Sequence, residues 1–319
     1  MMNSVNVNDK TKFSSYKLTR IISRVLAYTL LVILSIIWLY PMVWIVISSF
    51  TVNMKGGPVS VQNINFLPNW VSTRFGLDNY KNLFTSDWSN KIYINGELAS
   101  DSFHFFFKEW FGNTLFVAVF SCIISTAFTL MVAYVMSKLK FSFRKTYLNI
   151  ALVIGLFPGF MSMIAIYFIL KTFGLTGSLW ALILCNCAGA GTGFYVAKGF
   201  FDVIPNALME SARLDGANNA QIFLHIILPM SKPIVIYQAL MAFTGPWMDF
   251  IFAKVIMGEN SKNWTVSVGL YNSLFGSQPD ETVFSVFAAG CVCVAVPIVT
   301  LFMFLQKYYV EGVTAGSVK

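Results

Sequence analysis

The stretch Asn206–Pro233 reads NALMESARLDGANNAQIFLHIILPMSKP and is the only long polar-rich stretch between strongly apolar segments in the second half of the chain. Its apolar residues recur at helical spacing, which predicts a short helix that ends before Gly216. Asn218 can cap a second short helix. Proline removes a backbone donor and clashes with the preceding turn, so we expect Pro229 and Pro233 to end this second helix. The stretch therefore predicts a helix–glycine–helix element outside the membrane.

The composition is that of a membrane protein. Hydrophobic residues make up 56% of the 319 residues and charged residues only 11%, whereas charged residues make up about 25% of soluble domains. The net charge of +8 is not a nucleic-acid signature here, because the basic residues flank apolar runs and report on membrane orientation. We therefore expect a lipid bilayer around this chain and no nucleic-acid partner.

Six apolar runs are long enough to cross a hydrocarbon core of about 30 Å. The first, at about 25 residues, exceeds the roughly 7–15 residues of a signal-peptide core and is interpreted as a retained span. The other five runs cover about 112–136, 147–170, 179–200, 234–257 and 283–306. The expected divisions are an N-terminal segment 1–24, a first transmembrane helix 25–50, an extracytoplasmic loop or subdomain 51–111, a five-helix core 112–306 with the polar loop 202–233, and a tail 307–319.

The positions of Lys and Arg predict the orientation. Basic residues are denser in the segments on the side of the N-terminus, above all in the short loop 137–146, which contains Lys138, Lys140, Arg144 and Lys145. Cytoplasmic loops carry an excess of such residues. The prediction is an all-α membrane protein with six transmembrane helices, in which both termini and the polar loop are cytoplasmic.

The sequence offers no enzyme chemistry. The phosphate-binding pattern GxxxxGK[ST] is absent, so no ATPase activity is expected of this chain. The glycine-rich run Gly189–Gly193 lies inside a span, where small residues favour close helix packing or a break near a pathway. The two histidines fall on opposite sides of the predicted membrane, and the five cysteines lie in apolar runs. We therefore expect no catalytic residue, no bound metal and no cofactor on this chain.

Asp249 is the one acidic residue inside a predicted span, in the sequence Gly245–Phe250 (GPWMDF). Charged groups at membrane depth are costly and usually face a bundle interior or a water path. Asp249 can therefore belong to a translocation pathway or gate together with Trp247 and Phe250. It can equally form a structural hydrogen bond between helices, and a third interpretation makes it the coupling site for a proton or sodium ion.

The polar stretch resembles the "EAA" loop of ABC-importer permeases. That family pattern is E-A-A, a glycine four residues after the last alanine, and I-x-L-P about nine residues further. Ser211 stands where the family usually has alanine. The resemblance implies that this loop contacts an ATPase. It is carried by Glu210, Ser211, Ala212, Asp215, Gly216, Ala217, Leu228 and Pro229.

Two further stretches resemble carbohydrate importers. The sequence around Asp249 is similar to the W-N-[ED]-F signature of the fifth span in sugar-importer permeases. The end of the chain resembles the tail of the maltose/maltodextrin (MalG-type) permease subunit, which reaches into the ATPase dimer interface. In this chain the tail residues implied are Thr314, Ala315 and Gly316.

This resemblance implies a type I ABC-importer permease fold in the cell membrane. The implied partners are a second permease subunit, an ABC ATPase dimer that carries ATP and Mg²⁺, and an extracytoplasmic sugar-binding protein facing loops 51–111 and 258–282. The implied substrate is a carbohydrate, with malto-oligosaccharide first and galacto- or another oligosaccharide as the alternative. In the MalG type the sugar is held mainly by the partner permease.

Two other classes of transporter stay open. One is an ABC permease for another solute such as polyamine or phosphonate, and the other is an ATP-independent secondary transporter that uses Asp249.

Overall fold

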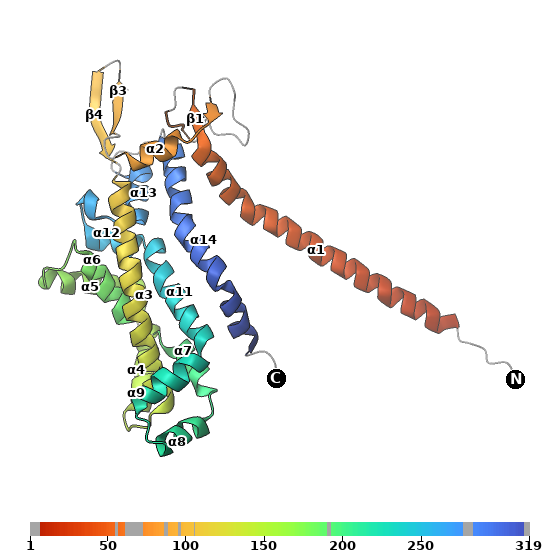
Figure 1. Ribbon diagram of the computed structural model, residues 1–319. Helices are drawn as coiled ribbons and strands as arrows, with labels where there is room; N and C mark the ends of the chain where they lie inside the picture. The colour runs from red at the N-terminus through yellow and green to blue at the C-terminus, as the bar shows by residue number, and fades with distance from the viewer. Residues whose placement is uncertain are drawn as a thin grey trace.

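The computed structural model describes residues 7–54, 57–60, 73–85, 89–94, 97–104, 106–189, 193–276 and 283–315. This part of the chain is mostly helical (Figure 1). Its helices are α1 (Val7–Phe50), α2 (Asp78–Phe84), α3 (Phe107–Lys138), α4 (Arg144–Gly155), α5 (Gly159–Thr172), α6 (Leu179–Ala188), α7 (Tyr195–Asp202), α8 (Asn206–Leu214), α9 (Asn219–Ile222), the π-helical η3 (Phe223–Ile227), α10 (Leu228–Met230), α11 (Lys232–Met248), α12 (Ile251–Met257), the 3₁₀ turn η4 (Ser261–Asn263), α13 (Val266–Phe275) and α14 (Phe284–Ala315).

Three helices of the described chain are long and apolar enough to cross a membrane alone: Arg20–Phe50 in α1, Phe107–Lys138 in α3 and Phe284–Gln306 in α14. They coincide with the first, second and last predicted spans. Asn219–Met230 and Lys232–Met248 would form a fourth span if this pair, bent by 88°, is counted as one.

The other three predicted spans are not single helices in this structure. The run 147–170 is divided between α4 and α5 around Pro158, 179–200 between α6 and α7, and 234–257 between α11 and α12 at Asp249. Proline explains the first break, because its ring removes a donor and displaces the preceding turn. Breaks at membrane depth are tolerated where the freed backbone groups find partners inside the protein. At the third break, Ser267 Oγ donates to Asp249 O (2.6 Å).

The helix α1 projects away from the bundle and meets it only near its C-terminal end (Figure 1). Its described side chains from Arg20 to Met42 are exposed and mostly apolar. The end of α1 is fixed by a buried polar cluster. Asn79 Nδ2 of α2 donates to the carbonyls of Ser49 and Thr51 (both 2.9 Å), and Ser285 Oγ of α14 donates to Asn79 Oδ1 (3.1 Å).

The segment between α1 and α3 is the predicted extracytoplasmic subdomain 51–111. It contains α2 and two antiparallel hairpins, one pairing β1 (Thr51–Asn53) with β2 (Thr73–Phe75) and the other pairing β3 (Ser89–Ile94) with β4 (Glu97–His104). The helix α3 begins at Phe107, four residues before the predicted end of this segment at 111. The predicted partner-facing loop 258–282 is mostly folded inward, because α13 places Val266, Val268 and Leu270 in the core.

The core of the bundle is formed by α3, α11 and α14, with α6, α7 and α13 packed around them. Two separate hydrophobic clusters fill it. The larger one contains Trp110, Trp247 and Trp264 and lies toward α2 and α13. The smaller one contains Tyr134, Phe201 and Ile222 and lies toward α8 and α9. The bundle thus has two ends of different construction, with a polar stretch of α3 between them.

Candidate functional site

The predicted helix–glycine–helix element is present as residues 206–230, here called the α8–α9 element. The helix α8 ends at Leu214, and the chain turns at Gly216 with φ of +85°, a conformation that L-residues with a Cβ disfavour. Asn218 Oδ1 accepts from Gln221 N (2.9 Å), and Gln221 Oε1 accepts from Asn218 N (2.8 Å). This reciprocal capping box starts α9 and confirms the cap predicted at Asn218.

The second helix ends at Met230, one residue past Pro229 and before Pro233, close to where the two prolines were expected to end it. The helical path continues through the π-helical turn Phe223–Ile227 and through Pro229 to Met230. A π-turn already interrupts the regular hydrogen-bond ladder, so a proline beside it removes little. Pro233 lies in the first turn of α11, where the backbone donor has no helical partner. The two helices meet at Ser231 with the 88° bend.

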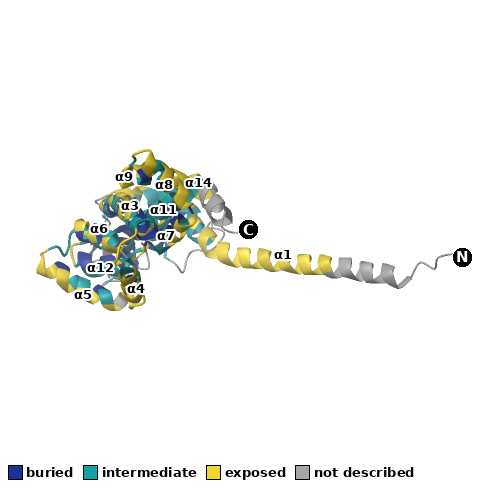
Figure 2. Ribbon diagram, turned by 90° about the horizontal axis from the view of Figure 1, so that it is seen from below, coloured by how far each residue is buried: buried dark blue, intermediate teal, exposed yellow. Residues whose placement is uncertain are grey.

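The α8–α9 element is seated on the bundle through its apolar face. Met209, Ile222 and Ile227 are buried in the smaller cluster, and Phe223 packs on Tyr134 of α3 with ring centroids 5.0 Å apart. The opposite faces of α8 and α9 are exposed, as the view from below shows (Figure 2). Burying about three large apolar side chains is sufficient to hold so short an element in one place.

Polar contacts fix the chain where it enters α8. Lys138 Nζ at the end of α3 donates to Ile204 O (2.6 Å) and Asn206 Oδ1 (3.3 Å). Ser137 Oγ donates to Asp202 Oδ1 (2.6 Å), and Lys198 Nζ pairs with Asp202 Oδ2 (2.6 Å). Partial burial acts to raise the pKa of Asp202, but these two hydrogen bonds and the positive charges around it outweigh burial and hold the pKa below its usual value.

The exposed face of the element carries two acidic side chains without a partner in the described chain. Glu210 and Asp215 are exposed and form no ion pair there, while Arg213 Nη2 donates to Asn219 Oδ1 (3.3 Å). Leu214 has 90% of its surface exposed at the end of α8. Sequence reasoning did not single out Leu214 as an exposed apolar side chain, although its place directly before Asp215 and Gly216 was a usable signal.

The remaining predicted residues of this element fall around its turn. Ser211 is exposed on α8, and Ala212 and Ala217 are half-buried against the smaller cluster. A hollow of about 330 Å³ opens beside Gly216. It is lined by Asp215, Gly216, Ala217, Gln221, Ile222, His225 and Ile226.

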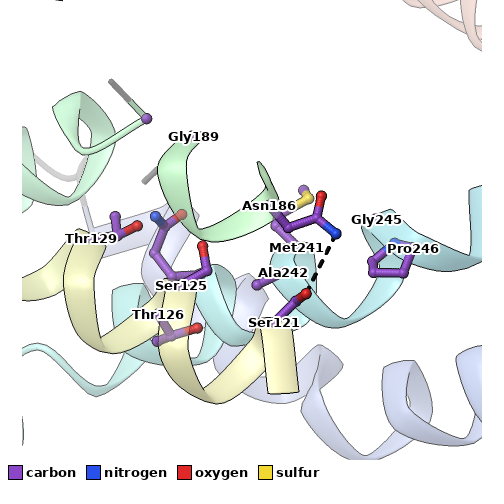
Figure 3. Close-up of a pocket in the computed structure, with 12 residues that line it drawn as sticks. Ser121, Ser125, Thr126, Thr129, Asn186, Gly189, Met241, Ala242, Gly245 and Pro246 are labelled. Atoms are coloured by element: carbon purple, nitrogen blue, oxygen red, sulfur yellow. Dashed lines mark hydrogen bonds between the residues drawn. The ribbon is translucent and has the colours of Figure 1, made fainter. Parts of the chain in front are cut away.

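A polar pocket of about 290 Å³ lies between α3, α6 and α11 (Figure 3). Sequence reasoning did not assemble it, because its polar residues are scattered over three separate apolar runs. Asn186 Nδ2 of α6 donates to Ser121 Oγ of α3 across it (3.4 Å). The pocket is lined by Ser121, Ser125, Thr126, Thr129, Asn186, Gly189, Gly193, Gln238, Met241, Ala242, Gly245 and Pro246.

The predicted gate residues lie just beyond this pocket, at the break between α11 and α12. Trp247 is buried, and its ring packs against Phe111 with centroids 5.2 Å apart. Phe250 packs on Tyr271 at 4.3 Å. The carboxylate of Asp249 lies beside the backbone amides of Phe252 and Ala253 at the start of α12, where the helix dipole favours a negative charge.

The predicted tail differs from its expected boundary. The helix α14 continues past residue 306 to Ala315, so Thr314 and Ala315 belong to its last turn. Gly316 lies outside the described residues. In the part of the chain that the structure describes, no group of three or more His, Cys, Asp or Glu side chains could hold a metal ion.

Comparisons with known proteins agree with this architecture. Residues 129–314 match the family described as "Binding-protein-dependent transport system inner membrane component". The chain is 31% identical over 307 residues to the Galactooligosaccharides transport system permease protein GanQ of Bacillus subtilis, covering 95% of this chain and 98% of that one. It is also 31% identical to the Maltodextrin transport system permease protein MdxG of the same organism, covering 94% and 98%.

A solved structure shares the fold. A chain of a bacterial ABC transporter involved in the import of the acidic polysaccharide alginate superposes with a TM-score of 0.71 at 20% identity, covering 91% of this chain and 98% of that chain. The family match covers more than half of the sequence and includes the α8–α9 element and the pocket helix α11. The chain therefore belongs to the family of binding-protein-dependent transport system inner membrane components and is a multi-pass membrane protein.

Proposed function

We propose that this chain is the permease subunit of an ATP-driven oligosaccharide importer, in which the α8–α9 element receives the closing motion of an ABC ATPase dimer. The proposal rests on the contrast between the two faces of that element. Its apolar face is seated in the smaller cluster, and its other face presents Glu210, Leu214 and Asp215 without partners in the described chain. A stiff, specifically shaped surface of this kind suits docking into a cleft.

The path from this surface to the membrane interior is short. The α8–α9 element passes through the bend at Ser231 into α11, and α11 supplies Gln238 and Pro246 to the polar pocket. Beyond the pocket the same helix ends beside Trp247 and Asp249. A tilt of the element would therefore move one wall of the pocket and the residues next to it. This linkage can convert ATPase closure into alternating access.

The assembly we propose contains a second permease subunit, two ATPase subunits that bind ATP and Mg²⁺, and an extracytoplasmic sugar-binding protein. We expect both termini of this chain to be cytoplasmic and the tail residues Thr314, Ala315 and Gly316 to contact the ATPases. Relatives named for galacto-oligosaccharides and maltodextrin support an oligosaccharide as substrate. The MalG-like tail favours a malto-oligosaccharide.

The test is co-purification of the chain with its ATPase, together with sugar-stimulated ATP hydrolysis and uptake in proteoliposomes. Wild type should retain the ATPase, whereas Glu210→Ala and Gly216→Pro should lose it or hydrolyse ATP without transport. Gly199→Ala on α7 is a matched control, because a Cβ there meets no atom within 4 Å and no positive φ is involved. Normal uptake in both variants would contradict the proposal, as would uptake without ATP.

A further inference from the structure

The polar pocket offers more hydrogen-bonding capacity than the described chain uses. Ser125 and Gln238 form no side-chain hydrogen bond with any described residue. The Oγ1 of Thr126 is enclosed by the protein near the thiol of Cys122 and is not open to the pocket. An accessible hydroxyl or amide without a protein partner, such as those of Ser125 and Gln238, is available to a polar guest or to ordered water.

The pocket is also electrically neutral. None of its twelve lining residues is ionisable. The acidic residue nearest to the pocket along the chain is Asp249, three residues after Pro246. The cation of Lys254 is held elsewhere, 4.5 Å above the Trp264 ring and 3.3 Å from Asn272 Oδ1. An anion in the pocket would therefore find no cation among the described lining residues to neutralise it.

The pocket has the size of one subsite. Its volume of about 290 Å³ lies at the lower end of the range of roughly 300–1,000 Å³ that is typical of ligand sites. Hydroxyl and amide groups from α3, α6 and α11 face apolar surface from Met241, Ala242 and Pro246 (Figure 3). A sugar ring presents the same combination of hydroxyl groups and C–H surface.

We propose that this pocket is a subsite of the chain itself for one neutral sugar unit of the passing oligosaccharide, and that it excludes units bearing a carboxylate. The proposal rests on the proposed transport function and adds a direct substrate contact and a charge preference to it. It also separates this chain from its structural neighbour, whose transporter imports an acidic polysaccharide. Ser125 and Gln238 are the residues assigned to the sugar hydroxyls.

The experiment uses the complete permease–ATPase complex without the binding protein, held by a non-hydrolysable ATP analogue. Equilibrium dialysis measures the Kd of radiolabelled maltotriose or galactotriose, whichever the transporter imports, and of trigalacturonate. The neutral sugar should bind at least about tenfold more tightly. Ser125→Ala and Gln238→Leu should each weaken its binding by about two- to tenfold, the loss expected for one hydrogen bond.

Thr244→Val is the matched control, because the Thr244 hydroxyl donates to Leu240 O of its own helix (2.9 Å) and does not line the pocket. Its Kd should equal that of wild type. An unchanged Kd in both pocket variants would overturn the subsite, and equal affinity for trigalacturonate would overturn the charge preference. Failure of the proposed transport function would give a different result. The wild-type complex supplied with ATP would then import neither maltotriose nor galactotriose.

Discussion

The two ends of the helical bundle differ in how far their side chains are held by contacts within the chain. At the end that carries α13, large rings and side chain-to-backbone hydrogen bonds hold the chain to itself. Trp110 Nε1 donates to Ser261 O (2.7 Å), Asn113 Nδ2 to Lys262 O (2.9 Å), and Trp264 Nε1 to Gly258 O (2.8 Å). At the end that carries α8 and α9, a small apolar cluster supports an exposed surface. Arg213, Asn218, Asn219 and Gln221 pair with one another on that surface, whereas Glu210, Leu214 and Asp215 have no partner in the described chain.

This difference indicates where the chain depends on partners. The α13 end is tied together by hydrogen bonds from Trp110, Asn113 and Trp264, although the buried Nε1 of Trp247 has no partner in the described chain, and it should tolerate little change in volume. The α8–α9 end leaves its acidic groups and Leu214 to a neighbour, so substitutions on its surface should affect assembly more than folding. The variants below test this division in order of expected effect on stability.

Gly269→Ala should be the most destabilising change. A Cβ at this position would lie 2.2 Å from ring atoms of Trp110, which is buried and hydrogen-bonded and cannot move away. Overpacking of this kind costs about 1–3 kcal/mol, and this contact should fall at the upper end. Thermal unfolding in detergent should show a lower Tm. Gly112→Ala on the neighbouring helix α3, where a Cβ meets no atom within 4 Å, should leave the Tm unchanged or slightly higher.

Gly216→Ala should cost about 1–2 kcal/mol, the strain of a left-handed residue with a Cβ. Space is not the cause, because nothing lies within 4 Å of the added methyl group. The same thermal unfolding measurement should be paired with ATPase co-purification. We expect a moderate fall in Tm and a larger loss of bound ATPase, since the turn between α8 and α9 sets the shape of the docking surface. Equal Tm and full ATPase retention would show that the turn is not required.

Asp202→Asn should reduce stability by about 0.5–1 kcal/mol at pH 7, a value lowered for solvent screening because Asp202 is 42% exposed. The folded-state pKa of Asp202 is below its unfolded value, so its contribution is present above the unfolded pKa and is lost as the pH falls through the folded pKa. The difference in unfolding free energy between wild type and variant should therefore be constant from pH 7 to pH 5 and shrink only in stronger acid. A difference that varied between pH 7 and 5 would argue against this carboxylate as the source.

Leu214→Ser should have the smallest effect on stability, within about 0.5 kcal/mol, because the side chain is 90% exposed. Its effect on ATPase retention should nevertheless exceed that of Leu208→Ser, whose side chain is 41% exposed on the same helix. Pull-down of the ATPase at increasing salt would measure the difference. Equal retention in both variants would remove Leu214 from the docking surface.

The local features of the α8–α9 element could be predicted from sequence because they depend on neighbouring residues. Asn218 and Gln221 form a capping box by their spacing, and Gly216 suits a left-handed turn. The course of the chain at Pro229 was not predictable in this way, because the π-helical turn before it removes the usual cost of proline. Local patterns therefore predicted the turn at Gly216 and the cap at Asn218, but not the π-helical turn or the 88° bend at Ser231.

The pocket could not be predicted from one sequence. Ser121, Asn186 and Gln238 lie on helices that are far apart along the chain, and each is a single polar residue in an apolar run. Only the packing of α3 against α6 and α11 shows that these side chains face a common space. The break at Asp249 has the same cause, since its carbonyl is satisfied by the Ser267 hydroxyl of α13, whereas Pro158 is a local signal for the first broken span.

The most direct test of the central claim is photo-crosslinking from two exposed positions in the complete, membrane-embedded transporter. A photoreactive amino acid would replace Leu214 on the α8–α9 element or Met248, which is 79% exposed at the far end of α11. We predict an adduct with the ATPase subunit from position 214 and none from position 248, with the yield at 214 changing when ATP is added. An ATPase adduct from position 248, or none from position 214 in a transporter that imports sugar, would contradict the account.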